Sequence, residues 1–119
     1  MAPLPRHVIA FDKDTIEPRQ TVTADPALVD RPYRAQSWRH FEKAEKGAMA
    51  GIWEAEPHLE RVDCDYDELC HILEGTVRLT DAAGVARTFG QGDSFVVAAG
   101  FKGTWENLTH VRKVFFILA

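Results

Sequence analysis

Cysteine is scarce in this sequence of 119 residues, with only Cys64 and Cys70 present. Two cysteines are too few for a disulfide framework, and free thiols suit the reducing cytoplasm. No apolar run approaches the roughly 20 residues that a membrane span needs, and the first residues lack the basic and apolar segments of a secretion signal. The sequence therefore predicts a cytoplasmic protein with no membrane partner.

The sequence also lacks an excess of positive charge. Its 14 basic residues against 18 acidic ones give a net charge of −4, and Lys and Arg are scattered along the chain. Surfaces that bind nucleic acid need clustered basic residues, so no nucleic-acid partner is expected. A Gly-rich phosphate loop, a Cys-x-x-Cys pair and the Gly-x-Ser-x-Gly motif of hydrolases are absent as well, which removes the common signatures of those enzyme classes.

Proline is unevenly distributed, because five of the six prolines lie in the first 32 residues. A regular helix or a central strand is unfavourable in such a segment. From about Gln36 onward, short runs of β-branched and aromatic residues alternate with turn residues, which predicts many short strands packed as a sandwich or barrel. We therefore expect a proline-rich N-terminal strap over 1–35 and a β domain over 36–119. The expected strands are near 36–42, 48–55, 59–64, 68–74, 76–80, 86–89, 93–97, 103–107 and 111–118.

Two segments carry recognisable motifs. In the first, Glu68 and Gly75 are separated by six residues, and in the second, over 92–107, glycines at 92 and 100 precede a closing asparagine. These segments resemble the two motifs of the cupin superfamily. The closer likeness is to the small single-domain subgroup that includes the (S)-ureidoglycine aminohydrolase domain and many proteins of unknown function. The residues that carry this likeness are 51–54, 67–70, 100–106 and 112–113. The resemblance implies an all-β fold, the antiparallel double-stranded β-helix or RmlC-like jelly-roll barrel.

The resemblance also implies four metal ligands, most of which are missing here. The His-x-His pair of the first motif falls at Val62 and Cys64, or at Arg61 and Asp63 in the alternative spacing, so neither spacing gives a histidine. The fourth ligand falls at Gly103, and only Glu68 remains. Zinc and manganese sites use three or four protein ligands, and no metal cofactor is therefore expected. The alternative is a divalent metal, zinc by preference, held by Cys64, Glu68 and Cys70, with His58 as a further ligand if its strand extends that far.

Strand alternation indicates which side chains face the interior. The even-numbered residues of 68–72 should point inward and the odd-numbered ones outward. If residues 65–67 form a tight turn, Cys64 lies directly opposite Glu68 in a hairpin. The same parity on the later strand places Gly103 and Trp105 inside, with the glycine leaving room for the indole or for a ligand.

A ligand site is therefore expected inside the barrel, with Lys102 in the loop at its mouth, where it would steer an anion or pair with Glu68. Core packing is the alternative for the tryptophans, and a solvated side chain is the alternative for the lysine. No catalytic residue is assigned, but Glu68 is the best candidate, because a buried carboxylate is costly without a partner. The candidate ligand-binding residues are Glu68, Cys64, Cys70, Trp53, Trp105 and Lys102.

Three functions fit this pattern. The first is a module that binds a small polar metabolite without a metal. The second is an enzyme of ureidoglycine type, acting on a small nitrogenous metabolite with Glu68 as ligand or general base. The third is an accessory or assembly protein with a vestigial pocket. Outward Leu69 and Leu73 and the apolar end over 115–118 predict a homodimer as well.

Overall fold

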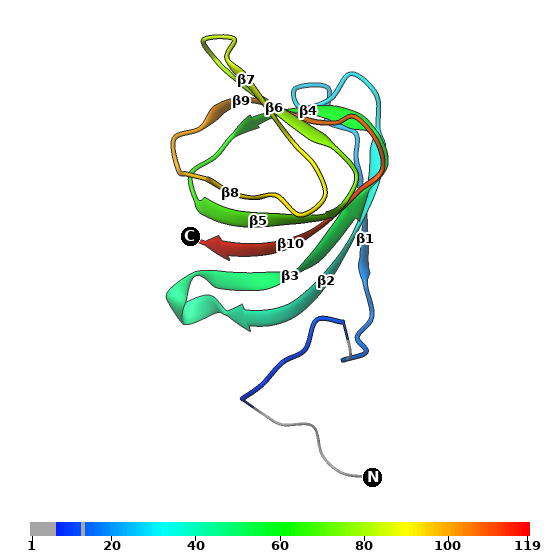
Figure 1. Ribbon diagram of the computed structural model, residues 1–119, viewed down its shortest axis with the longest axis vertical. Helices are drawn as coiled ribbons and strands as arrows, with labels where there is room; N and C mark the ends of the chain where they lie inside the picture. The colour runs from blue at the N-terminus through cyan, green and yellow to red at the C-terminus, as the bar shows by residue number, and fades with distance from the viewer. Residues whose placement is uncertain (1–6, 13) are drawn as a thin grey trace.

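The computed structural model describes residues 7–12 and 14–119, and strands make up most of it (Figure 1). The elements in chain order are β1 (Arg19–Thr23), β2 (Tyr33–Lys43), the 3₁₀ turn η1 (Ala44–Lys46), β3 (Ala48–Ala55), β4 (His58–Asp63), β5 (Asp67–Glu74), β6 (Val77–Asp81), β7 (Ala86–Phe89), β8 (Ser94–Val97), β9 (Lys102–Asn107) and β10 (Val111–Leu118). No helix in the described ranges is long and apolar enough to cross a membrane.

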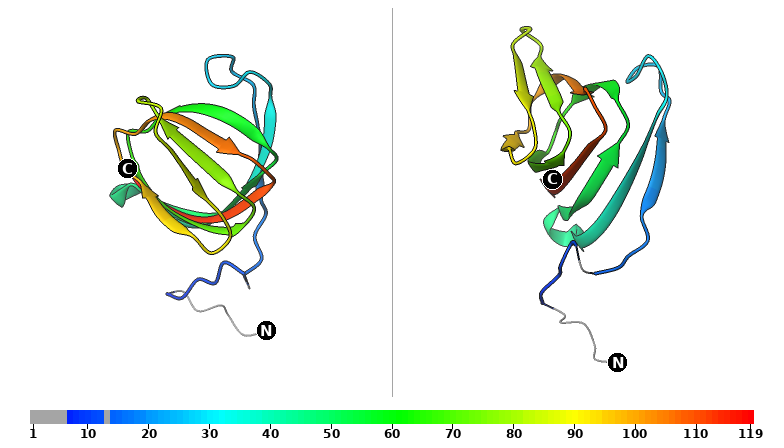
Figure 2. Two further views of the ribbon diagram at one scale, coloured as in Figure 1. Left: turned by 45° about the horizontal axis from the view of Figure 1, so that its top comes forward. Right: turned by 45° about the vertical axis from the view of Figure 1, so that its right-hand side comes forward.

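The strands form two antiparallel sheets that face one another (Figures 1 and 2). One has six strands in the order β1-β2-β3-β10-β5-β8, and the other has four in the order β4-β9-β6-β7. The predicted all-β jelly-roll class is confirmed, and each expected strand has a counterpart. The expected closed barrel is not formed, because no strand of one sheet is hydrogen-bonded as a neighbour to a strand of the other within the described residues.

The N-terminal strap adds a strand to one edge of the larger sheet. β1 pairs only with β2, from Arg19 opposite Ser37 to Thr23 opposite Tyr33. An edge strand satisfies its backbone on one side alone, so the proline that precedes it is tolerated there. The loop that follows is held by Arg61, whose guanidinium donates to two carbonyl oxygens and one carboxylate of residues 26–30.

The expected hairpin between β4 and β5 is wrong. β4 pairs with β9 in the smaller sheet, while β5 pairs with β10 and β8 in the larger one. The chain therefore crosses from one sheet to the other between them, and Cys64 exchanges two backbone hydrogen bonds with the loop at Gly100 and Phe101. Cys64 and Glu68 are not cross-strand neighbours, but the crossing still brings both to the space between the sheets.

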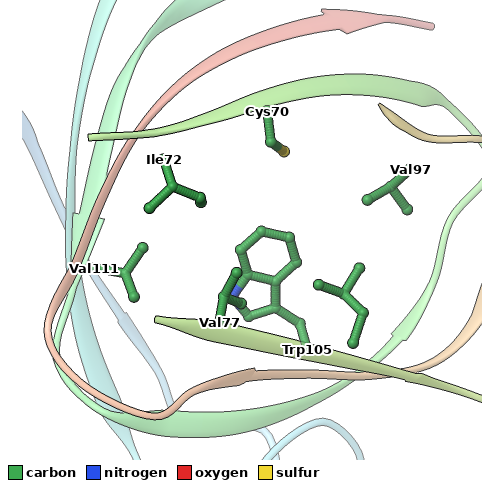
Figure 3. Packing of buried hydrophobic residues seen from close by; sticks show 7 residues of the cluster. Cys70, Ile72, Val77, Val97, Trp105 and Val111 are labelled. Atoms are coloured by element: carbon green, nitrogen blue, oxygen red, sulfur yellow. The ribbon is translucent and has the colours of Figure 1, made fainter. Parts of the chain in front are cut away.

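The main core fills one part of that space (Figure 3). It consists of Cys70, Ile72, Val77, Leu79, Val97, Trp105 and Val111. The expected alternation on β5 is confirmed, since Cys70 and Ile72 are fully buried while Leu69 is half exposed. Burying these side chains at about 25 cal/mol per Å² of apolar surface is the main force that joins the two sheets.

Candidate functional site

A cavity of about 270 Å³ lies between the two sheets and shares part of its wall with the core. Four of the residues expected from the sequence line it: Trp53, Cys64, Glu68 and Trp105. Trp105 has two roles, because it packs in the core cluster and also forms part of the cavity wall. His58, which the strand parity also points inward, is part of the wall as well. The structure adds polar residues that were not singled out from the sequence, above all Tyr33, Glu60, Tyr66 and Lys113.

Lys113 is the buried cation of this cavity. It is on β10, opposite Trp53 of β3 and Ile72 of β5, and only 6% of it is exposed. Its Nζ donates to Glu68 Oε2 at 2.7 Å and lies 3.7 Å from Cys70 Sγ. The ammonium also lies 4.1 Å from the ring centre of Trp105 and 4.8 Å from that of Trp53, which is within cation–π range. A carboxylate and two indoles thus enclose the charge.

Lys113 keeps its charge at neutral pH. Burial by itself lowers the pKa of Lys113, but Glu68 and Cys70 raise it by more, so the pKa lies above the ordinary value for lysine. Burial raises the pKa of the Cys70 thiol to about 12 against an opposing effect of Lys113. Cys70 therefore remains a thiol, and its S–H donates to Glu68 Oε2 at 3.3 Å. Cys70 is fully buried in the core and, against expectation, is not part of the cavity wall. We call Glu68 and Lys113 the ion-pair end of the cavity.

Trp105 is fixed by a hydrogen-bond chain that joins the sheets. Its indole Nε1 donates to Asn107 Oδ1 at 2.7 Å, and Asn107 Nδ2 donates to the carbonyl oxygens of Ala55 and Glu56 at 3.2 and 3.3 Å. Asn107 is 2% exposed, so these bonds satisfy an amide that would be costly to bury alone. The asparagine that closes the second motif therefore orients the indole that lies over Lys113.

A second carboxylate, Glu60, has quite different partners. The Tyr33 hydroxyl donates to Glu60 Oε1, and the Tyr33 ring stacks on His58 with ring centres 3.4 Å apart. Burial lowers the pKa of His58, so its ring is neutral at neutral pH, and Nδ1 donates to the carbonyl oxygen of Glu56 at 2.7 Å. Burial raises the pKa of Tyr66 to about 12, with Glu68 adding to the shift. We call Tyr33, His58 and Glu60 the phenol end of the cavity.

The sequence model of the EutQ-like cupin domain matches residues 42–115, which is more than half of the chain. The chain belongs to the EutQ-like cupin domain family. Comparison with curated proteins finds no match.

Solved cupin structures show the same fold. A Pseudomonas syringae protein of unknown function from the DUF861 family superposes with a TM-score of 0.76 at 23% identity, over 88% of this chain and 45% of that one. The Clostridium difficile EutQ protein gives a TM-score of 0.64 at 16% identity, over 72% and 63% of the two chains. A Thermotoga maritima DUF861 protein gives 0.52 at 34% identity, over 54% and 73%. The chain thus spans about half the length of the first of these proteins.

The metal that the cupin superfamily implies does not fit this donor set. Lys113 places an ammonium 2.7 Å from Glu68, the one remaining carboxylate ligand, so a divalent ion there would meet a fixed positive charge. Among residues 7–12 and 14–119, no group of three or more His, Cys, Asp or Glu side chains is placed to hold a metal. The thiols of Cys64 and Cys70, which could replace histidine, both have pKa values raised first of all by burial.

Lys102 and Gly103 lie in surroundings that differ from those expected from the sequence. Lys102 is mostly exposed on β9, with its Nζ 4.0 Å from Asp63 Oδ2, and it is not part of the cavity wall. The cation that pairs with Glu68 is Lys113 instead. Gly103 does not leave room for a ligand, since a Cβ there would overlap the backbone carbonyl of Thr80 on β6. Its glycine is required by a close approach of two strands.

Lys113 is the most important residue that the sequence analysis did not select. The signal is present in strand alternation, because Val111 and Phe115 flank it at two residues on either side and both are buried. A lysine between two inward apolar residues is unusual enough to mark an internal cation. Tyr33 offers no such signal, since it lies at the end of the strap, and its contact with Glu60 joins positions 27 residues apart.

Proposed function

We propose that this cupin domain binds a small polar metabolite in the cavity between its sheets and does so without a metal ion. The observation that carries the proposal is the cavity of about 270 Å³ whose wall combines aromatic rings with a buried ion pair and a second carboxylate. Ligand sites are typically apolar cavities with a few fixed polar groups. The volume is below the usual range for drug-sized ligands, which restricts the occupant to a small molecule.

The state of Lys113 supports binding more than lysine chemistry. An amine acts as nucleophile or general base only when it is deprotonated, whereas the pKa of Lys113 is raised above its ordinary value. An enzyme of ureidoglycine type would use Glu68 as a ligand or base, but Glu68 Oε2 already accepts from both Lys113 and Cys70. These contacts favour a fixed electrostatic role for the ion-pair end.

Tryptophan fluorescence tests the proposal directly. Of the three tryptophans, Trp53 and Trp105 line the cavity, while Trp38 lies under the guanidinium of Arg112 and does not line it. The Trp38→Phe variant should therefore report on the cavity with little background. We expect at least one small acid, amide, ureide or amine to change its emission saturably, with the same change in the presence of a chelator. A panel of these classes that leaves the emission unchanged would refute the proposal, and a chelator that abolishes the response would refute its metal-free part.

We also propose that the domain is a homodimer. On the outer face of the larger sheet, Phe116, Leu69 and Val96 are direct cross-strand neighbours and are 42%, 50% and 61% exposed. An apolar row of this kind usually marks an interface. Light scattering should return twice the chain mass for the wild type and the single chain mass for Leu69→Lys. A monomeric wild type at micromolar concentration would contradict this.

A further inference from the structure

The phenol end of the cavity carries a carboxylate, Glu60, that is paired with no cation of residues 7–12 and 14–119. Glu68 is paired with Lys113, but none of the ion pairs of the described residues includes Glu60. Its partner is the Tyr33 hydroxyl, a neutral donor that uses Oε1 and leaves Oε2 available. A partly buried carboxylate is stabilised most by donors that are charged. The phenol end therefore retains acceptor capacity and a negative charge.

His58 adds a second acceptor beside Glu60. Its Nδ1 bonds to the Glu56 carbonyl oxygen, which can only accept, so the proton of the neutral ring is on Nδ1. Nε2 then has a lone pair without a hydrogen-bond partner in the part of the chain that the structure describes, and His58 is part of the cavity wall. Glu60 and His58, which carry these two acceptors, therefore line the same small cavity.

The surrounding surface is aromatic. Tyr33 stacks on His58, and the edge of Trp53 approaches the same imidazole with ring centres 6.1 Å apart. Aromatic faces and a carboxylate together form the environment in which organic cations bind well. Lys113 is an example within the same cavity, since its ammonium is held by two indoles and Glu68.

The charges in the cavity wall determine which charge and which hydrogen-bonding groups a ligand needs. The cavity wall contains the carboxylates of Glu60 and Glu68 and the ammonium of Lys113, which is paired with Glu68. Arg39 also lines the cavity, but it comes from the bulged part of β2 after Trp38. Its Nε is buried without a hydrogen-bond partner among the described residues, so Arg39 can donate to an oxygen atom of the ligand. The acceptor-rich wall is the phenol end.

Resting on the proposed binding function, we infer that the ligand is a small organic cation that presents a protonated nitrogen group, such as an ammonium or guanidinium, to Glu60. The N–H groups would donate to Glu60 Oε2 and His58 Nε2, and the aromatic rings would cover its apolar surface. A neutral ureide of the same shape offers fewer donors and no charge, so it should bind more weakly.

Matched probes test this class. Methylguanidinium, methylurea and acetate are titrated into the Trp38→Phe protein at neutral pH and constant ionic strength, with tryptophan emission as the readout. We expect saturable binding of methylguanidinium with an affinity at least about tenfold above that of methylurea, and no response to acetate, because bonds to charged groups are the stronger ones.

Variants then assign the effect to Glu60. Glu60→Gln keeps an acceptor for Tyr33 and removes the charge, so it should lower the affinity for methylguanidinium by about tenfold or more. Glu106→Gln is the matched control, since Glu106 is on the same sheet but pairs with Arg78 outside the cavity wall. Three results would each overturn the inference that the ligand is a cation. They are an affinity for methylurea or acetate equal to that for methylguanidinium, no response to any of the three probes, and undiminished binding of methylguanidinium by Glu60→Gln. Binding of a neutral or anionic metabolite in the wider panel would still uphold the proposed binding function.

Discussion

Glu68 and Glu60 are carboxylates of the same cavity, yet their partners differ in charge. Glu68 accepts from an ammonium that is almost fully buried, and the exposed fractions of the two side chains are 13% and 8%. Glu60 accepts from a phenol hydroxyl and has no ion pair among the described residues. One charge is therefore compensated within the folded chain, and the other is only hydrogen-bonded.

This difference gives the two carboxylates different roles, one in the stability of the fold and the other in the binding of a ligand. A buried ion pair with extra hydrogen bonds is complete in the absence of a ligand, and removing either partner leaves the other charge buried alone. A carboxylate bonded to a neutral phenol can gain a stronger partner when a cation arrives. The ion-pair end should therefore determine folding stability, and the phenol end should determine which ligand is bound.

The largest expected effect comes from breaking the ion pair. Lys113→Met removes the charge but keeps most of the apolar side chain, so Glu68 remains buried without its cation. We expect a loss of about 3–5 kcal/mol in the free energy of unfolding, measured by urea denaturation. Glu68→Gln should lose a comparable amount, because it leaves the ammonium unpaired. The double variant Lys113→Met with Glu68→Leu should recover much of the loss, and losses that simply add would contradict the ion-pair assignment.

A smaller effect is expected at the phenol end. Glu60→Gln preserves the acceptor for the Tyr33 hydroxyl, so the same urea measurement should show a change below about 1 kcal/mol. Tyr33→Phe, which leaves the carboxylate without its donor, serves as the comparison and should cost more than Glu60→Gln. A Glu60→Gln loss as large as that of Glu68→Gln would remove the distinction between the two ends.

The smallest expected effect is a pH dependence. Burial lowers the pKa of His58 below its ordinary value of 6.5, so the unfolded chain takes up a proton more readily than the folded one. Above about pH 6.5, protonation of His58 therefore does not reduce the free energy of unfolding. As the pH falls below this value, the unfolded chain takes up the proton first and the free energy of unfolding decreases. The groups that act on it are Glu60, Glu56 and Lys113.

This dependence is measured as a difference between two proteins. Thermal unfolding of the wild type and of His58→Gln from about pH 7 to about pH 5 should show the wild type losing more stability on acidification. The other titrating groups are common to both proteins and cancel in the comparison. Parallel profiles would mean that His58 is not buried as neutral imidazole.

The fold could be predicted from the sequence because its signals are local. Alternation places Cys70 and Ile72 inside and Leu69 outside, and glycines at turns separate the strands; Gly75, Gly92 and Gly100 have φ values of 92°, 88° and 99°. Such patterns show which face a residue occupies. They do not show which strands are neighbours, and this is why the β4–β5 hairpin was expected where the chain instead crosses between sheets.

The site was predictable only in part for the same reason. Glu68 and Trp105 follow from motif and parity, but the partner of Glu68 is 45 residues away on β10. Their contact depends on β10 lying beside β5, which no local pattern encodes. The pairing of Tyr33 with Glu60 requires the strap to fold over the edge of the smaller sheet, and the bridge between Val29 and Glu60 holds it there.

Lys113 also affects how uniform the protein population is. A bound ion must be acquired after synthesis, competes with other ions and can be lost to a chelator, so the loaded fraction varies with supply. The ammonium of Lys113 is covalently part of β10 and is enclosed by Glu68 and two indoles as soon as the sheets pack. Every folded copy therefore carries the same charge at this position, whatever the metal content of the medium in which it was made.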